Sequence, residues 1–318
     1  MTSRAKKDRF RKGNLFIPLI FSFGAALEDM ALDDFLEDPT KISNTMRLIQ
    51  NHFQGDGTVC YADHTVLART LGCDAAMGEY PPSVEPLAEW PGDLEQRIQD
   101  LPRSGGVATA LEVTRRLNIL LPEAILVGMV AGPIKLLAQL TGDSGEAPLQ
   151  RPERLGIAGR ATLTFAKALG EAGIDILIVL DEPIPLLTDQ DVKVLSRCYT
   201  PIWNTAKFYD VVPLLMLEDF PANNATRFAP IVDGMVVPID AVHSHKRGKK
   251  LSVSLPVSLL EEEPGEIETA LVGTGIFNDL VSAKLFLVTT QGEIPAHIDK
   301  EHMIRGIQTI RDFLRNRC

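Results

Sequence analysis

Short runs rich in Val, Ile and Leu recur along the chain, and each is followed by polar or Gly/Pro residues and then by apolar residues at helical spacing. The rhythm repeats about eight times. The expected strands lie at residues 15–23, 58–62, 125–131, 174–180, 211–217, 235–239, 251–255 and 285–289. Their apolar character is continuous, because a parallel barrel strand is covered on both faces. The pattern predicts an α/β protein, a single-domain (β/α)8 TIM barrel.

Two helices have readable boundaries in the sequence. Thr188 and Asp191 indicate an N-cap before a long helix, and a last amphipathic helix begins near Asp299.

Two stretches are less regular. Residues 80–106, with several prolines, are expected to be a long insertion after the second strand. Residues 141–154 form a polar loop that is either a mobile flap or an ordinary surface loop.

Composition and charge narrow the function classes. The 318 residues, 45% of them hydrophobic, can build one barrel core, expected at residues 15–318 after a basic tail at 1–14. The short basic runs at 4–9 and 246–250 are interpreted as a solvated tail and a solvated loop. The net charge of -10 argues against a nucleic-acid partner. No apolar stretch is long enough to span a membrane and the N-terminus is charged, so we expect a cytoplasmic protein.

The four cysteines indicate neither a disulfide framework nor a zinc site. Their positions show no CxxC pair and no metal-like spacing: Cys60, Cys73, Cys198 and Cys318. HExxH, DxDxDG, phosphate-loop and GxSxG motifs are also absent from the sequence. We therefore expect no bound metal.

Acidic residues follow several of the predicted strands. In barrel enzymes the active site lies at these carboxyl ends of the strands. The residues at these strand ends are Asp63, His64, Asp181, Glu182, Glu218, Asp219, Asp240 and Glu293. Cations are scarce at this level, and Lys135, after Gly132-Pro133, is the clearest exception. Carboxyl groups held close together cannot all ionise, so at least one pKa should rise and provide a general acid. The alternative for each one is that it caps a helix or binds backbone amides.

Several segments, in order, resemble the uroporphyrinogen decarboxylase superfamily over nearly the whole chain. They are residues 63–73 (DHTVLARTLGC), 82–84 (PSV), 130–137 (VAGPIKLL), 173–183 (GIDILIVLDEP) and 292–295 (GEIP). The resemblance implies the barrel fold.

Departures from the family pattern select a branch. The decarboxylases have substrate-binding arginines after the first strand, where this chain reads Phe21-Ser22-Phe23-Gly24-Ala25-Ala26. Thiol-activating methyltransferases of the family bind zinc at positions that here are similar to Leu217, Asp219 and Gly292. The remaining resemblance is to the corrinoid (cobalamin)-dependent methyltransferase branch, without zinc.

That resemblance implies methyl transfer from a small methylated or methoxylated donor to a corrinoid carried by a partner protein. We expect Glu182 or Asp219 to be the general acid, with Asp181 and Glu218 as neighbours that raise its pKa. Expected substrate-binding residues are Phe21, Phe23, Asp63, His64, Met216 and Glu293. A homodimer is also expected from the resemblance. Two alternatives stay open: a decarboxylase or lyase acting on a non-porphyrin acid, and a non-catalytic tetrapyrrole- or corrinoid-binding barrel.

Overall fold

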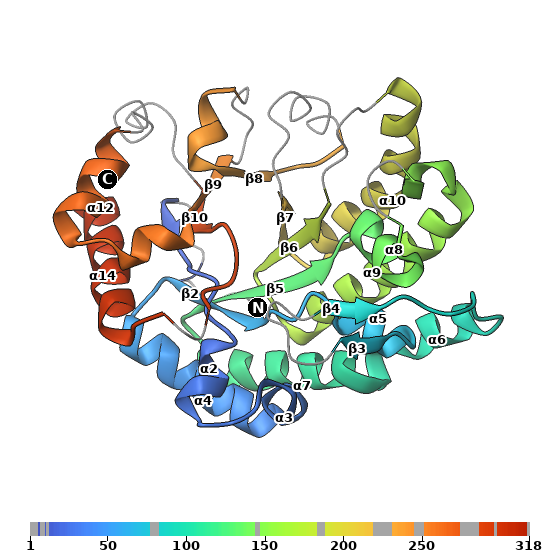
Figure 1. Ribbon diagram of the computed structural model, residues 1–318, viewed down its shortest axis with the longest axis horizontal. Helices are drawn as coiled ribbons and strands as arrows, with labels where there is room; N and C mark the ends of the chain where they lie inside the picture. The colour runs from blue at the N-terminus through green and yellow to red at the C-terminus, as the bar shows by residue number, and fades with distance from the viewer. Residues whose placement is uncertain are drawn as a thin grey trace.

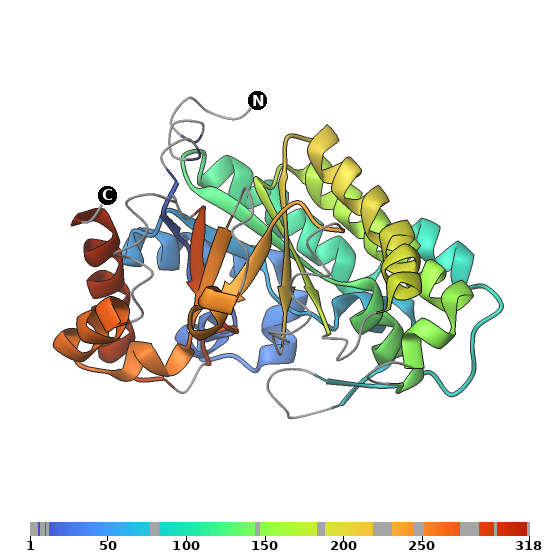
Figure 2. The same ribbon diagram turned by 90° about the horizontal axis from the view of Figure 1, so that it is seen from above.

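Eight parallel strands form the centre of the computed structural model and helices surround them, as the sequence pattern predicts (Figures 1 and 2). The structure describes residues 6, 10, 13–76, 83–143, 147–182, 188–218, 231–244, 251–273, 286–295 and 298–316. The barrel strands are β1 (Leu15–Phe16), β2 (Gly57–Tyr61), β5 (Ile125–Ala131), β6 (Ile176–Asp181), β7 (Val212–Leu217), β8 (Met235–Pro238), β9 (Leu251–Leu255) and β10 (Leu287–Thr290).

The strands pair in the order β1-β10-β9-β8-β7-β6-β5-β2, and every pair is parallel. At the remaining seam, β1 is joined to the residue before β2. The Asp56 amide donates to the Phe16 carbonyl over 3.3 Å, and the Phe16 amide donates to the Asp56 carboxylate over 2.8 Å. These bonds nearly close the ring into a (β/α)8 barrel.

The first strand is much shorter than the predicted run at 15–23. Pro18 has no amide hydrogen, so it cannot donate to the ladder with β10. Beyond it, the Leu19 amide donates to the side-chain hydroxyl of Thr290 over 3.1 Å instead of to a carbonyl. The other predicted strands agree with the structure to within about two residues, as expected for strand boundaries.

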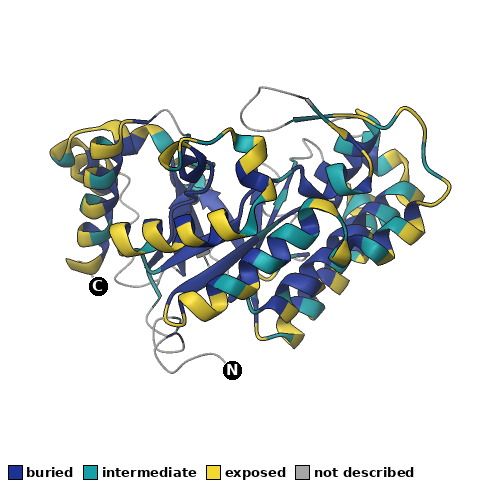
Figure 3. Cartoon of the chain, turned by 90° about the horizontal axis from the view of Figure 1, so that it is seen from below, coloured by how far each residue is buried: buried dark blue, intermediate teal, exposed yellow. Residues whose placement is uncertain are grey.

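The helices are α2 (Phe23–Leu27), α3 (Leu32–Glu37), α4 (Pro39–Phe53), α5 (Val66–Leu71), α6 (Leu94–Asp100), α7 (Gly105–Leu120), α8 (Pro133–Thr141), α9 (Pro152–Ala172), α10 (Asp189–Phe208), α12 (Pro264–Gly273) and α14 (Lys300–Asn316). The predicted start of α10 is confirmed, because Thr188 and Asp191 form a reciprocal capping box. The inner faces of the helices and the strands are buried, whereas the outer helix faces are exposed (Figure 3).

The predicted insertion is more ordered than its sequence indicates. Near its start, β4 (Ser83–Glu85) pairs antiparallel with β3 (Asp74–Ala76), which lies just before the predicted insertion, and α6 follows. The ribbon lies against the end of α8, where the Leu87 amide donates to the Leu140 carbonyl over 3.1 Å. The polar stretch at 141–154 is also partly ordered, since it contains a 3-10 turn (Ala147–Gln150) and the start of α9. The described residues of both stretches are therefore not plain loops.

The basic N-terminal run is not wholly solvated, which corrects the interpretation made from its charge. Lys6 is 3% exposed, and its ammonium lies 2.8 Å from the Asp175 carboxylate, just before β6. The ring of Phe10 stacks on that of Phe286, with 5.8 Å between centroids. A buried cation requires a partner, and Asp175 supplies it. The second basic run, residues 246–250, lies outside the described residues.

Three of the cysteines, Cys60, Cys73 and Cys198, are buried free thiols, as the sequence indicates. Cys318 lies outside the described residues. Among the helices that the structure describes, none is long and apolar enough to cross a membrane.

Candidate active site at the carboxyl ends of the strands

The central feature of the site is the buried carboxyl group of Asp181, the last residue of β6. It accepts hydrogen bonds from the backbone amides of Lys135, Glu182 and Ile134, over 2.6, 2.9 and 3.4 Å respectively. The hydroxyl of Tyr199, from α10, donates a further hydrogen bond to it. Asp181 therefore joins the start of α8 to α10 and lies in the protein interior rather than in solvent.

Burial and hydrogen bonding act on Asp181 in opposite directions. Burial raises the pKa of its carboxyl group to about 6, although the Tyr199 hydroxyl and the three amides favour the ionised form and oppose that rise. Burial also raises the pKa of the Tyr199 hydroxyl well above its ordinary value, so the phenol is the proton-bearing partner. These two groups form a buried hydrogen-bonded pair, and the same Asp181 carboxyl group fixes the backbone of Lys135 and Glu182.

Gly132 makes this arrangement sterically possible. A Cβ atom at Gly132 would overlap the Asp181 carboxyl group. Its amide also donates to the Leu180 carbonyl over 2.7 Å, and Pro133 then starts α8 with a fixed backbone angle. The Gly-Pro pair thus permits close contact between the start of α8 and the end of β6.

Lys135 introduces positive charge into the site from the first turn of α8. Its ammonium donates to a carboxylate oxygen of Glu218, immediately after β7, over 2.7 Å. The lysine side chain is 6% exposed and the glutamate side chain 41% exposed. The backbone amide of the same lysine is held by Asp181. The ammonium is therefore fixed in a buried position, while its carboxylate partner faces solvent.

Glu182 and His64 also belong to this cluster of titratable groups, and their surroundings set their protonation states. Burial raises the pKa of Glu182, the charges of Asp181 and Glu218 add to the rise, and Lys135 opposes it. Burial together with Lys135 lowers the pKa of His64 to about 4, against the effect of Asp63. At neutral pH the imidazole is therefore uncharged, and Glu182 holds its proton more strongly than an ordinary glutamate does.

Two of the predicted substrate-binding carboxylates bind the starts of helices. Asp63 accepts from the Thr65 amide over 2.8 Å and from the Thr65 hydroxyl over 2.6 Å, before α5, and pairs with Arg69 at 3.4 Å. Glu293 accepts from the Ser22 amide, at the start of α2. Both contacts fit the alternative interpretation of acidic strand ends as helix caps. A role in binding substrate stays a prediction for each of them.

The three predicted apolar contacts with substrate are buried side chains. Phe21, Phe23 and Met216 are 1%, 4% and 2% exposed. The ring of Phe21 packs against those of Phe35 and Tyr61, at centroid distances of 5.8 and 5.0 Å. The structure thus gives Phe21 a role in core packing, and contact with substrate stays a prediction for all three.

Other predictions at the barrel mouth have different outcomes. Asp219, predicted as an alternative acid, lies outside the described residues. Asp240 is exposed, on a 3-10 turn after β8. Among the residues that the structure describes, no group of three His, Cys, Asp or Glu side chains is arranged to hold a metal ion.

The sequence does not reveal the roles of two residues of this site. Lys135 was an isolated cation among acidic strand ends, and the only signal was its position two residues after Pro133. Tyr199 fitted the apolar spacing of a long helix, and nothing in its sequence context indicates a bond to Asp181.

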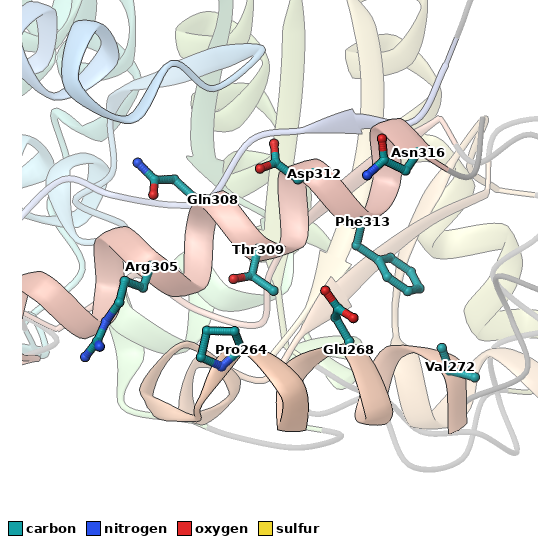
Figure 4. Close-up of a pocket in the computed structure, with 9 residues that line it drawn as sticks. All are labelled: Pro264, Glu268, Val272, Arg305, Gln308, Thr309, Asp312, Phe313 and Asn316. Carbon is teal, nitrogen blue, oxygen red and sulfur yellow. The ribbon is translucent and has the colours of Figure 1, made fainter.

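Two surface grooves lie away from this cluster. One, of about 450 Å³, lies between α12 and α14, with Glu268, Arg305 and Asp312 among its lining residues (Figure 4). The other, of about 420 Å³, is lined by residues near the amino ends of β2 and β5, including Asp56 and Glu123. Barrel enzymes carry out their chemistry at the opposite, carboxyl ends of the strands. The charged cluster there is therefore the better candidate.

Known structures share this architecture. A methyltransferase from Methanosarcina mazei is 16% identical, with a TM-score of 0.74 over 97% of this chain and 96% of its own. A protein from Listeria monocytogenes named as a vitamin-B12-independent methionine synthase is 12% identical, with a TM-score of 0.55 over 95% and 96% of the two chains. A B12-independent methionine synthase from a Shewanella species is 11% identical, with a TM-score of 0.54 over 89% of each chain. At these identities the likeness concerns the fold alone.

Sequence comparison gives the family. No protein with a curated description matches the chain significantly. Residues 20–200, more than half of the chain, match the sequence profile of the family described as uroporphyrinogen decarboxylase (URO-D). The matched segment includes the end of β6 and the whole of α8, which carry Asp181, Glu182 and Lys135. The chain belongs to the uroporphyrinogen decarboxylase family.

Proposed function

We propose that this protein transfers a methyl group from a small methylated or methoxylated substrate to the corrinoid of a partner protein, without zinc. The observation that carries the proposal is the cluster of Glu182, Glu218 and Lys135 at the barrel mouth, with a raised pKa at Glu182. A leaving group that departs with an electron pair needs a proton, and a carboxylic acid of raised pKa can supply it.

The departures from the family pattern favour the corrinoid-dependent methyltransferase branch over the decarboxylases and the zinc-dependent methyltransferases. The segment after β1 provides no arginine, so a polycarboxylate porphyrinogen would meet carboxyl groups without guanidinium partners. The positions that resemble zinc ligands are Leu217, a buried apolar residue, Asp219 and Gly292. None supplies a thiolate or imidazole for tetrahedral zinc. In this proposal the corrinoid is a substrate, the methyl acceptor, rather than a resident cofactor.

The chemistry balances with the residues in place. The bond between the methyl carbon and its heteroatom breaks, and the heteroatom keeps the electron pair. The reduced cobalt of the acceptor provides the pair for the new bond to the methyl carbon. Glu182 gives a proton to the departing atom and regains one from water. Such general acid catalysis contributes about 10²- to 10⁴-fold to the rate.

Glu182 suits this role better than Asp181 does. Asp181 is fully buried and accepts four hydrogen bonds, so proton transfer from it would disturb the start of α8. Glu182 is only partly buried and its pKa is raised by burial and by two neighbouring carboxyl groups. In this proposal Asp181 positions the cluster and Glu182 acts as the acid.

An anaerobic assay with reduced cob(I)alamin and a panel of methyl donors tests the proposal. The panel contains aryl methyl ethers, methylamines and halomethanes, and the absorbance of methylcobalamin reports transfer. We expect transfer from at least one donor class, and a loss of about 10²-fold or more in Glu182→Gln for donors whose leaving group needs a proton. The exposed Glu153, in the first turn of α9, gives the control variant Glu153→Gln, which should keep full activity.

Each outcome of this assay has a meaning. Unchanged transfer in Glu182→Gln would remove Glu182 from the role of acid. Absence of transfer from every donor, by a folded protein that binds cobalamin, would contradict methyl transfer and favour a non-catalytic corrinoid-binding barrel.

Lys135 favours a second candidate, a lyase or decarboxylase acting on a non-porphyrin acid. A buried ammonium can bind a substrate carboxylate. A substrate carboxylate would have to displace Glu218 from that ammonium and would then lie, as an anion, beside Glu182. A neutral ether oxygen meets no such repulsion. Release of carbon dioxide from a panel of small carboxylic acids would favour this candidate over methyl transfer.

A further inference from the structure

We infer that Lys135 and Gln139 contact the leaving oxygen of the substrate and select donors whose methyl group is bound to oxygen. This inference rests on the proposed methyl transfer and names the substrate class of that site. It starts from two side chains of α8 to which the proposed function assigns no contact with the substrate. They are four residues apart, so they lie one above the other on the same face of the helix.

Lys135 is held at two points, and only its partner is free to move. Its backbone amide donates to Asp181 over 2.6 Å and its ammonium to Glu218 over 2.7 Å. The lysine side chain is 6% exposed, whereas the Glu218 side chain is 41% exposed. Glu218 can turn towards water and remain solvated, while the lysine cannot follow it. A substrate oxygen can then take the place of the Glu218 oxygen at the ammonium.

Gln139, one helical turn along α8 from Lys135, has an unused hydrogen-bond acceptor. Its side-chain amide nitrogen donates to the His64 carbonyl over 3.3 Å. Its Oε1 atom is buried and has no hydrogen-bond partner. Exchanging the two amide atoms would set an oxygen against the carbonyl, so the observed orientation is the favourable one. A buried acceptor without a donor costs free energy that a ligand hydroxyl would recover.

The two side chains together match an oxygen and disfavour the other donor classes. A departing oxygen gains negative charge, which the Lys135 ammonium stabilises, and its hydroxyl product can donate to Gln139 Oε1. A protonated methylamine would place a second positive charge beside Lys135, and a departing halide has no hydrogen for Gln139. Methyl ethers and related O-methyl compounds therefore fit the pair.

The remaining titratable groups around Lys135 are compatible with an oxygen leaving group. Glu218 faces it from the end of β7, Glu182 and Asp181 from the end of β6, and His64 from the end of β2. In the transfer step the carbon–oxygen bond breaks, the oxygen keeps the electron pair and receives the proton of Glu182, and the acceptor cobalt forms the new bond to carbon. Lys135 stabilises the oxygen before that proton arrives.

A binding experiment tests this site without any turnover. The probe is 4-nitrophenol, whose ionised form absorbs visible light, titrated with pH in the presence of excess protein. We expect the pKa of the bound phenol to be at least about one unit lower than in water, because the ammonium favours the phenolate. The shift should be lost in Lys135→Met and retained in Lys135→Arg. Lys167→Met, at an exposed lysine of α9, is the matched control and should behave as the native protein does.

Gln139→Leu tests the second contact. It removes the acceptor and should weaken binding of un-ionised 4-nitrophenol about tenfold, the ordinary effect of losing one buried hydrogen bond. Circular dichroism establishes that each variant is folded. Binding that is absent in the native protein, or unchanged in both Lys135→Met and Gln139→Leu, would overturn the inference.

The donor panel separates this inference from the proposed function. Transfer from methyl ethers and not from methylamines or halomethanes supports both. Transfer from methylamines or halomethanes alone would leave methyl transfer standing and refute the selection of oxygen. Absence of transfer from every donor would refute the proposed function, and with it this inference about its substrate, even if 4-nitrophenol binds.

Discussion

The free energy of unfolding of this protein should fall as rising pH ionises the buried Asp181 carboxyl group. Asp181→Asn should remove that part of the pH dependence. The substitution keeps the size of the side chain and the oxygen that accepts from the Lys135 and Glu182 amides. Its amide nitrogen replaces the oxygen bonded to the Tyr199 hydroxyl, which can accept as well as donate. The variant therefore keeps these contacts of a protonated Asp181 at every pH. It loses only the long hydrogen bond from the Ile134 amide, 3.4 Å from the replaced oxygen, and is expected to fold.

The magnitude follows from the raised pKa. In the folded protein the pKa of Asp181 is about 6, against an ordinary value of 3.8. A folded-state pKa above the unfolded one means that the native state binds the proton more tightly. The stabilisation is therefore fully present below about pH 4 and is lost as the pH rises through about 6. A difference of about two pH units corresponds to roughly 3 kcal/mol.

Urea denaturation at several pH values between about 4 and 7 measures the effect. Trp203 is a suitable fluorescence probe, because its ring stacks on that of Tyr199 with 5.6 Å between centroids. Titrating groups that do not interact with Asp181 are common to both proteins and cancel in the difference between them. Glu182 is the exception, because the charge of Asp181 raises its pKa. From about pH 4 to pH 7, the free energy of unfolding of the native protein should fall by roughly 3 kcal/mol relative to that of Asp181→Asn.

Two results would refute this reasoning. A constant difference across the pH range would mean that burial does not perturb Asp181. A difference that grows in favour of the native protein at higher pH would mean that its four hydrogen-bond donors outweigh burial, so that the folded-state pKa is lowered instead.

Two further pairs of substitutions test the contacts near the two ends of β6. Gly132→Ala should destabilise the protein by about 2 kcal/mol or more, because the new Cβ overlaps the Asp181 carboxyl group. Gly156→Ala, where a new Cβ would lie 3.9 Å from the Arg160 guanidinium, should instead stabilise α9 by up to about 1 kcal/mol. Equal melting temperatures for the two variants would contradict the overlap at Gly132. Lys6→Met should cost about 3–5 kcal/mol, since it leaves Asp175 buried without its ammonium. Adding Asp175→Asn should recover part of that loss in urea denaturation, and a fully additive double variant would argue against the pair.

Local sequence signals determined the architecture of this protein. Apolar runs predicted the barrel strands because a parallel strand buried on both faces must be apolar along its length. The capping box of α10 was readable because its two residues, Thr188 and Asp191, are three positions apart. The family resemblance likewise depended on ordered short segments, and the matched profile over residues 20–200 agrees with it.

The tertiary structure decided what each charged residue does. An acidic residue after a strand can cap a helix or carry a proton, and the choice depends on which helix start lies beside it. Two of the three amides that hold Asp181 lie 46 and 47 positions earlier in the chain, and the amide bound by Glu293 lies 271 positions earlier. Lys6 meets Asp175 across 169 positions. Closure of the barrel brings these groups together, and burial then sets their charges, because the free energy of a charge depends on the atoms around it in space.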